Sequence, residues 1–473
     1  MIEKYYSGVI EQIYNRIGKE TRNIVMANYS NDFSIENLEV IRRYQSNEDN
    51  VFFAYSEFSY NTLVGAYEPF LDIICNMHRR FIGGSFDDFQ KECGVYYLHR
   101  QVLNSYYETG ECFREETVLL NEVAYEQRRM TMAIADMLKK LSEVKPLMIV
   151  INRFQMASKS SIETIKYLID NPCANIGIVL GVNAIVKGTD STVEVWDRIV
   201  ESLEDRSAIY YIGSAGPLKN NVKTTNDDEL YITMNFEQSI QEASNIMEFL
   251  DFEQARRGCR IIEHKLKFED AWIDEKSLRR FYMVYARTSV LLGEMSKAIE
   301  LTNEYKALIP ENDSEHYLSL YYFMKGTCYM YQGKLEKAGN SAKSAYDYAV
   351  LAEDDTLIFK AELLSVMIKM SGWYNIFFCV QDIPVSDEII EKLIKHGYRN
   401  HLAHIYIYAY DNSRDVVKQS FYDESLLKHF TKGLELAKEI GNEQLVYDAY
   451  QKTIMLASTS GLNEIAFLYV IRT

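Results

Sequence analysis

The stretch PLMIVINRFQMASKS, residues 146–160, combines a short apolar run, a polar loop and the start of a helix. The apolar run Leu147–Ile151 is short and rich in β-branched residues, which is typical of a strand that is covered on both faces. Asn152 and Arg153 follow directly, and Ser160 is a start signal for a helix. The segment therefore predicts the strand, loop and helix order of an α/β fold.

The same alternation of short apolar runs and helical patterns extends to about residue 235. The predicted strands are residues 23–28, 51–55, 147–151 and 176–182, and the predicted helices are residues 35–44, 69–81, 115–141 and 160–169. Alternation of this kind favours a parallel sheet covered by helices. We therefore expect residues 1–235 to form an α/β domain.

Beyond residue 235 the strand pattern disappears, and helical periodicity continues nearly to the end of the chain. One spacing recurs three times, in the pairs Gly293 and Ala298, Gly333 and Ala338, and Gly461 and Ala466. Glycine commonly ends a helix, and a small residue five positions later lets the next helix approach a neighbour closely. We expect residues 236–473 to form an all-α array of about five helical hairpins, and its ladder of small residues resembles the tetratricopeptide repeat.

Charge and composition limit the partners of the chain. Its 473 residues carry 51 basic and 68 acidic side chains, and the net charge of −17 repels nucleic acid and anionic lipid alike. Seven dispersed cysteines without a C-x-x-C pair favour reduced thiols. The first 20 residues form an amphipathic pattern, not a signal peptide, and no apolar run approaches the roughly 20 residues that span a bilayer. We expect a cytoplasmic protein that binds neither nucleic acid nor membrane.

The segment from Lys145 to Asn183 resembles the Walker B strand and following helix of STAND-type ATPases, the signalling branch of the AAA-like P-loop proteins. In that family the buried strand ends in paired acidic residues that serve magnesium and the attacking water. Asn152 and Arg153 stand at these positions. The resemblance therefore implies a P-loop NTPase-like domain that lacks its magnesium ligand and its catalytic base.

The loop after the first predicted strand also lacks the residues that the family uses for nucleotide binding. A phosphate-binding loop needs glycine for convergent N–H groups, lysine for the terminal phosphates, and serine or threonine for magnesium. The sequence YSNDFSIENLEVI, residues 29–41, contains neither glycine nor lysine, and Asp32 would repel phosphate. We therefore expect a degenerate domain without cofactor or enzymatic activity, kept for its shape.

Two alternatives remain open at this point. In the first, the domain is an ATP-binding switch with unconventional residues: Ser30 and Ser34 would contact phosphate or magnesium, and Asn152 or Gln155 would position water. In the second, the chain is a structural scaffold with no regulated state. Hydrolysis of ATP is the least expected of the outcomes, because both motifs lack the groups that it requires.

Three histidines in HGYRNHLAH could be read as metal ligands. His401 and His404 are one helical turn apart, and His396 lies just before them. A metal site would need a further Asp, Glu or Cys. We expect solvent-facing or core-edge positions in a repeat helix instead.

Four segments resemble clostridial signalling proteins in which a degenerate ATPase-like domain and tetratricopeptide repeats precede a diguanylate cyclase (GGDEF) domain. They are RNIVMANYSNDFSIENLEVI (22–41), KAELLSVMIKMSGWYNIFFCVQD (360–382), HLAHIYIYAYDN (401–412) and KTIMLASTSG (452–461). No GGDEF signature occurs in the chain, and its final FLYVIRT favours truncation within the array. The resemblance implies a sensory region that binds protein or peptide through its repeats, with homo-oligomerisation as a further option.

Overall fold

The computed structural model describes residues 2–29, 38–46, 50–59, 63–119, 122–183, 186–189, 193–212, 223–225, 235–268, 273–374, 387–408, 424–459 and 461–471. The chain divides into two compact units. The sheet unit comprises residues 1–95, 99–114 and 126–277, and the helical unit comprises residues 96–98, 115–125 and 278–473.

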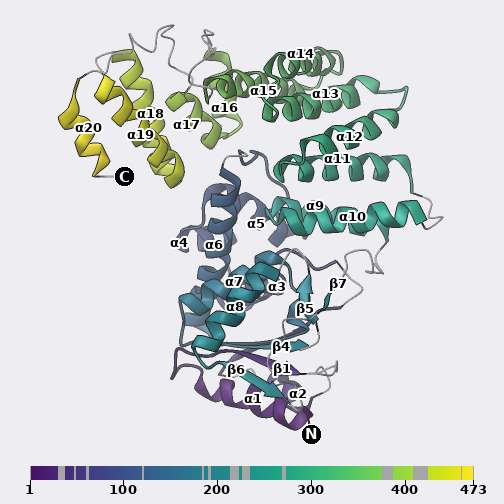
Figure 1. Ribbon diagram of the computed structural model, residues 1–473, viewed down its shortest axis with the longest axis vertical. Helices are drawn as coiled ribbons and strands as arrows, with labels where there is room; N and C mark the ends of the chain where they lie inside the picture. Colours follow the sequence, from purple (N-terminus) through teal and green to yellow (C-terminus); the bar gives the residue numbers. More distant parts are fainter. Residues whose placement is uncertain are drawn as a thin grey trace. The chain divides into compact units, whose positions relative to one another are not determined.

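A five-stranded parallel sheet forms the centre of the sheet unit (Figure 1). Its strands are β1 (Ile24–Tyr29), β2 (Phe52–Glu57), β3 (Leu147–Asn152), β4 (Ile176–Asn183) and β6 (Ile209–Ile212), in the order β2-β3-β4-β1-β6. Every residue of β3 and β4 is buried, as expected for strands covered on both faces. The four strands predicted from the sequence are confirmed, whereas β6 and the short pair β5 (Val186–Thr189) and β7 (Lys223–Thr225) were not predicted.

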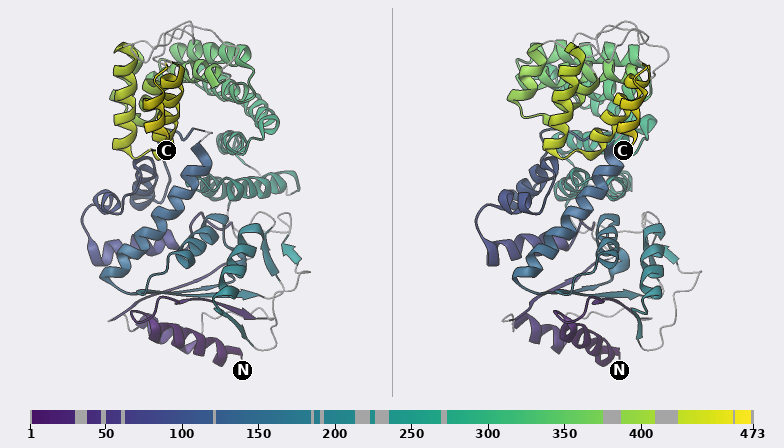
Figure 2. Two further views of the ribbon diagram at one scale, coloured as in Figure 1. Left: turned by 60° about the vertical axis from the view of Figure 1, so that its left-hand side comes forward. Right: turned by 90° about the vertical axis from the view of Figure 1, so that its left-hand side faces the viewer.

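Helices cover both faces of this sheet (Figure 2). Helices α1 (Ile2–Arg16) and α2 (Glu39–Ser46) lie on one face, where Tyr6, Ile10 and Ile41 join the side chains of β1 in one core cluster. Helices α7 (Lys159–Asp170) and α8 (Val193–Asp205) lie on the other face. The two layers explain why the strands read as continuous apolar runs.

The strand order marks a candidate site at the carboxyl-terminal ends of the strands. The connection that follows β1 leads to β2 at one edge, whereas the connection that follows β4 leads to β6 on the opposite side. In open α/β sheets, ligands bind outside the carboxyl ends of the strands at which the connections diverge. That position lies at the carboxyl ends of β1 and β4, beside the end of β3.

Several helices differ from the prediction. Residues 115–119 are not helical, and α6 begins only at Val123 and ends at Val144. Ser158, and not Ser160, caps α7, because its side chain accepts a hydrogen bond from the Ser161 backbone N–H. The helix predicted at residues 69–81 is α3 (Phe70–Met77), extended by a π-helical turn (His78–Ile82), and α4 (Phe86–Glu92) and α5 (Tyr97–Thr109) were not predicted.

The compact units do not follow the change of sequence pattern at residue 235. Helices α9 (Phe236–Glu248) and α10 (Phe252–Phe268) are helical in pattern yet belong to the sheet unit. Between them, the buried Asp251 carboxylate accepts a hydrogen bond of 2.9 Å from the Ser160 backbone N–H at the start of α7. The sequence pattern reports the type of element, whereas unit membership depends on contacts of this kind.

Five successive helix pairs make up the described part of the helical unit from residue 278 onward (Figure 1). They are α11 (Glu275–Leu291) with α12 (Met295–Ala307), α13 (Ser314–Tyr331) with α14 (Leu335–Leu351), α15 (Asp355–Tyr374) with α16 (Asp387–Lys395), α17 (Arg399–Tyr408) with α18 (Glu424–Ile440), and α19 (Glu443–Thr459) with α20 (Asn463–Val470). Over the described ranges, no helix combines the length and the apolar character that a membrane span requires.

The glycine and alanine spacing is confirmed as a hairpin signal. Gly293, Gly333 and Gly461 all lie in the turn between paired helices with φ of 76°, 71° and 77°. Side chains other than glycine rarely adopt this left-handed conformation. The three alanines that follow, Ala298, Ala338 and Ala466, are buried.

Gly433 in α18 lies in close contact with α17. A Cβ at this position would lie 2.7 Å from Ile407 Cγ1 and 3.1 Å from the Ala403 carbonyl oxygen. Because the latter atom is backbone, the two helices would have to separate. We expect Gly433→Ala to lower the free energy of unfolding by about 1–3 kcal/mol in urea denaturation.

Gly339 on α14 provides the matched control, because it is exposed and a Cβ added there would have no atom within 4 Å. Gly339→Ala should raise the free energy of unfolding by up to about 1 kcal/mol, since alanine favours the helix. A Gly433→Ala protein as stable as Gly339→Ala would contradict the close approach of α17 and α18.

Candidate functional site

Asn152 and Gln155 are fully buried at the carboxyl end of β3. The Asn152 Oδ1 accepts a hydrogen bond of 2.6 Å from the hydroxyl of Tyr29, the last residue of β1. The Gln155 Oε1 accepts a hydrogen bond of 3.3 Å from the backbone N–H of Asn183, the last residue of β4. The two amide oxygens therefore tie the end of β3 to its neighbour β4 and to β1, the next strand beyond β4. The other two predicted site residues, Ser30 and Ser34, lie outside the described residues.

Arg153 stands where the resemblance to STAND ATPases expects an acid. Its backbone is left-handed, with φ of 54°, and its Nη1 lies 3.2 Å from Oε1 of Glu57 at the end of β2. The same nitrogen donates a hydrogen bond of 3.4 Å to the Phe58 carbonyl oxygen. The guanidinium thus neutralises the carboxylate of β2, and its positive charge disfavours a second cation at this edge.

Asn28, the penultimate residue of β1, is a polar residue that sequence reasoning missed. It is fully buried, and neither of its amide atoms has a hydrogen-bond partner in the described part of the chain. Strand alternation directs it to the face opposite Tyr29. On that face, Trp196 of α8 also has a buried indole nitrogen without a partner among the described residues, and its ring lies 6.0 Å from that of Phe154. An unsatisfied buried amide costs roughly 1–3 kcal/mol, so its presence calls for an explanation.

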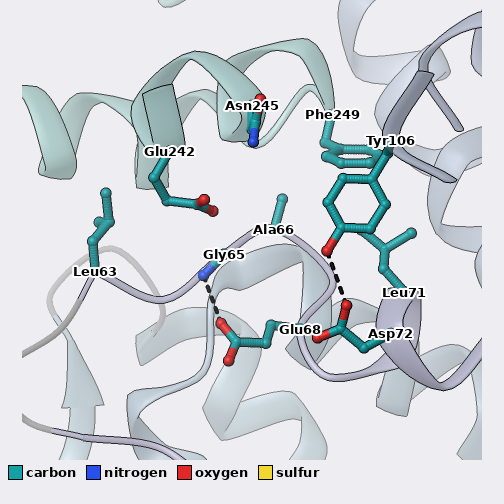
Figure 3. Close-up of a pocket in the computed structure, with 10 residues that line it drawn as sticks. All are labelled: Leu63, Gly65, Ala66, Glu68, Leu71, Asp72, Tyr106, Glu242, Asn245 and Phe249. Carbon is teal, nitrogen blue, oxygen red and sulfur yellow. Dashed lines mark hydrogen bonds between the residues drawn. The ribbon is translucent and has the colours of Figure 1, made fainter. Parts of the chain in front are cut away.

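A second candidate site in the sheet unit is a pocket of about 230 Å³ (Figure 3). We call it the acidic pocket, and it is lined by Leu63, Gly65, Ala66, Glu68, Leu71, Asp72, Tyr106, Glu242, Asn245 and Phe249. Figure 3 shows Glu242 and Asn245 on one helix, α9, facing the segment that carries Glu68 and Asp72. The pocket combines carboxylates with apolar and aromatic walls.

The three carboxylates of the acidic pocket differ in their hydrogen bonds. The Tyr106 hydroxyl donates to Asp72 Oδ1 at 3.0 Å, and the Gly65 backbone N–H donates to Glu68 Oε2 at 2.8 Å. Glu242 has no hydrogen bond to any described residue. Burial raises the pKa of Glu242 to about 7, and the negative charges of Glu68 and Asp72 contribute to this rise. Glu242 is therefore partly protonated near neutral pH.

Two buried acids of the helical unit pair with two histidines. The Glu116 Oε1 lies 2.6 Å from His401 Nδ1 and also accepts a hydrogen bond of 2.6 Å from the His401 backbone N–H. The Glu122 Oε1 lies 2.8 Å from His404 Nε2. His401 and His404 are 3% and 2% exposed, so the expectation that they are solvent-facing or at the core edge is wrong. Their partners lie 285 and 282 residues away, which sequence proximity could not reveal.

The pairs extend into a buried polar network around Glu122. Asn400 Nδ2 donates to Glu122 Oε2 at 2.9 Å, and Asn442 Nδ2 donates to Glu122 Oε1 at 2.8 Å. Burial alone would raise the pKa of Glu122, but the adjacent His404 and the hydrogen bonds from His404, Asn442 and Asn400 lower it to about 2. Each histidine faces its own glutamate, and in the described ranges no three His, Cys, Asp or Glu side chains are placed to hold a metal ion.

Solved structures that resemble this chain include two of low sequence identity. No protein-family model and no curated protein matches the chain. A STAND protein with a tetratricopeptide repeat sensor from Pyrococcus horikoshii shares 13% identity over 95% of this chain and 80% of its own, with a TM-score of 0.42. A Rap protein complexed with competence and sporulation factor shares 12% identity over 85% of this chain and 96% of its own, with a TM-score of 0.33. At these scores the fold assignment rests on the sheet order and the helical hairpins themselves.

Proposed function

We propose that this chain is the regulatory part of a bacterial signalling system, with an ATPase-like scaffold that does not hydrolyse ATP and helical hairpins that bind a protein or peptide. The main support for the proposal is that Asn152 and Arg153, which follow the apolar run of β3, both have partners within the protein. Asn152 is bonded to Tyr29, and Arg153 is ion-paired with Glu57. Neither side chain is free to serve magnesium or an attacking water, as hydrolysis would require.

The helical unit supports the binding half of the proposal. Stacked helical hairpins form extended surfaces on which other repeat proteins bind their partners. Tyr322 and Tyr348 stack at 5.6 Å and are partly exposed, and Tyr346 and Tyr447 are 39% and 46% exposed. Tyrosine combines a large apolar ring with a polar tip, which suits contacts with peptides. The output in this proposal is a diguanylate cyclase domain that lies outside the 473 residues, as the sequence resemblance implies.

The proposal is tested by nucleotide turnover and thermal unfolding of the full chain. We expect no magnesium-dependent release of phosphate from ATP, and no rise in melting temperature with millimolar ATP, ADP, GTP or cyclic di-GMP. Hydrolysis that stops when magnesium is removed would overturn the proposal.

A second function, a switch that binds ATP or another polar ligand, is favoured by Asn28. A ligand seated at the carboxyl end of β1 would satisfy its buried amide, which has no partner in the described residues. In that case ligand at 100 times its dissociation constant would add about 2.7 kcal/mol to the stability of the native state. Asn28→Leu should then remove the shift while leaving the free protein folded, because it also removes the unsatisfied amide. A shift that survives in Asn28→Leu would exclude this site.

A further inference from the structure

We propose that the acidic pocket binds a small organic ammonium ion, with Glu242 as the charged group that recognises it. The acidic pocket is separate from the candidate site at the carboxyl ends of β1, β3 and β4, since none of its lining residues belongs to these strands. The proposal rests on four features of the pocket: its size, its walls, its charge and its rigidity.

The size and the walls of the pocket favour a small, partly apolar ligand. Its volume of about 230 Å³ lies below the roughly 300–1,000 Å³ of pockets for drug-sized ligands. Leu63 and Leu71 supply aliphatic contacts, and the rings of Tyr106 and Phe249 meet edge to face with centroids 5.5 Å apart. Aromatic rings attract cations through their negative faces. An alkyl chain that ends in an ammonium group matches both kinds of wall.

The pocket carries an excess of negative charge, which a bound ammonium ion would offset. Three of the ten lining residues are acidic and none is basic. Asp72 and Glu68 already accept hydrogen bonds from Tyr106 and Gly65, as Figure 3 shows, whereas Glu242 accepts none from the described residues. A carboxylate can accept several hydrogen bonds, and an ammonium group donates up to three. Of the three carboxylates, Glu242 therefore has the most acceptor capacity left for a ligand.

Gly65 leaves room for this ligand beside Glu242. A Cβ at this position would lie 3.0 Å from Glu242 Oε1 and 3.4 Å from Glu68 Oε2, so any side chain would occupy the space between the two acids. Gly65 does not adopt a positive φ, so its backbone does not demand glycine. The missing side chain of Gly65 therefore leaves space in the pocket, and it is not required by the backbone conformation.

The helix that carries Glu242 is held in place by a buried polar anchor. Asn245, one turn further along α9, is 5% exposed. Its Oδ1 accepts a hydrogen bond of 2.9 Å from the Cys112 backbone N–H, and its Nδ2 donates one of 3.1 Å to the Gly110 carbonyl oxygen. The wall that faces Glu68 and Asp72 is therefore fixed before a ligand arrives, which lowers the entropic cost of binding.

Binding is coupled to protonation of Glu242. The titratable groups that interact with it are Glu68, Asp72, Tyr106 and Cys112. Burial and the two neighbouring acids favour the neutral form of Glu242, with a pKa of about 7 against an ordinary 4.5. An ammonium ion favours the ionised form, so its binding near pH 7 releases a proton.

The test is isothermal titration of the full chain at pH 7 with n-butylammonium and, separately, with Nα-acetyl-lysine methylamide. Both present an alkylammonium group, the first as a free amine and the second as a lysine side chain. We expect binding of both, no binding of the neutral n-butanol, and a proton release that is seen by comparing buffers of different ionisation enthalpy. Tighter binding of the lysine derivative would assign the site to a lysine of a protein, and tighter binding of the free amine to a metabolite.

Two variants and one control locate the site. Glu242→Gln should weaken ammonium binding at least tenfold and abolish the proton release, and Gly65→Ala should weaken binding by narrowing the pocket. Glu237→Gln, on an exposed position of the same helix, should bind as the wild type does. Failure of both amines to bind, unchanged affinity of Glu242→Gln, or binding of Mg²⁺ or Ca²⁺ in place of the amines would overturn the proposal.

The folding of Glu242→Gln is checked by its pH dependence. Because the pKa of Glu242 is raised in the folded state, the wild type should lose stability as the pH rises from about 4.5 to about 7. Glu68, Asp251 and Asp448 also have raised pKa values and are present in both proteins, so Glu242→Gln should show a smaller loss than the wild type and should be the more stable protein at pH 8. This readout does not require a ligand.

Discussion

Replacing Glu122 by glutamine is expected to lower the free energy of unfolding by about 3–5 kcal/mol, which is the usual cost of removing one member of a buried charged pair. Glu122 is 2% exposed and accepts hydrogen bonds from Asn400 and Asn442 in addition to its contact with His404. Glutamine has the same shape but only one acceptor oxygen, and its amide group would face the donors of Asn400 or Asn442. Urea denaturation at pH 7, followed by circular dichroism, measures the difference.

Glu443 supplies the control for this variant. Its carboxylate accepts a hydrogen bond of 2.9 Å from the Tyr125 hydroxyl, but it is exposed. Glu443→Gln should change the stability by no more than about 1 kcal/mol. A double-mutant cycle of Glu122→Gln with His404→Gln should give a coupling energy above about 1 kcal/mol. If Glu122→Gln were as stable as Glu443→Gln, the buried network would not hold the helical unit together as the distances imply.

The network explains how residues 115–125 join the helical unit. The sheet unit is interrupted after Arg114 and resumes at Glu126, so residues 115–125 are a short segment of the helical unit inserted into it in sequence. Their polar anchors are Glu116 at the N-terminus of α17 and Glu122 beside His404. A helix N-terminus favours negative charge, which adds to the hydrogen bonds that Glu116 receives there. These polar contacts give the segment a specific partner, in addition to the apolar burial of Val118 and Val123.

The sheet could be predicted from sequence where burial was uniform. LMIVI and IGIVLGV are continuous apolar runs because β3 and β4 are covered on both faces. The strand β6, with the sequence IYYI, is short and lies at the edge of the sheet, where one strand neighbour is missing and the apolar signal is weak. The sequence pattern places the start of α6 too early because residues 115–119 are held by contacts with α17, which no local pattern encodes.

The candidate sites divide in the same way. Asn152 and Arg153 could be placed at the end of a strand from sequence, but the pairing of Arg153 with Glu57 depends on the register of β2 against β3. Asn28 gave only the weak signal of one amide in an apolar strand. The acidic pocket could not be predicted from the sequence, because its acids stand far apart in the chain, at positions 68, 72 and 242, and each resembles an ordinary surface carboxylate. Local spacing identifies sites built by one segment and misses those built by tertiary contact.

Acidic pH is expected to lower the stability of the native state through protonation of Glu122. The pKa of Glu122 is about 2 in the folded chain against an ordinary 4.5, so folding favours its ionised form. Its contribution is complete above pH 4.5 and is lost as the pH falls toward 2. The difference between these values corresponds to about 3 kcal/mol, of which about half should be gone near pH ~3.

Comparison with Glu122→Gln isolates this effect from other titrating groups. Asp448 acts in the opposite direction, because burial raises its pKa and its protonation on acidification relieves that cost. Asp448 and the histidines are present in both proteins, so the difference in stability between wild type and Glu122→Gln chiefly reports Glu122. We expect that difference to be largest at pH 7 and to shrink steadily below about pH 4.5 in urea titrations at fixed ionic strength. A difference that stayed constant down to pH ~3 would show that the carboxylate is not held ionised by His404, Asn400 and Asn442, and that the stability of the network comes from its shape alone.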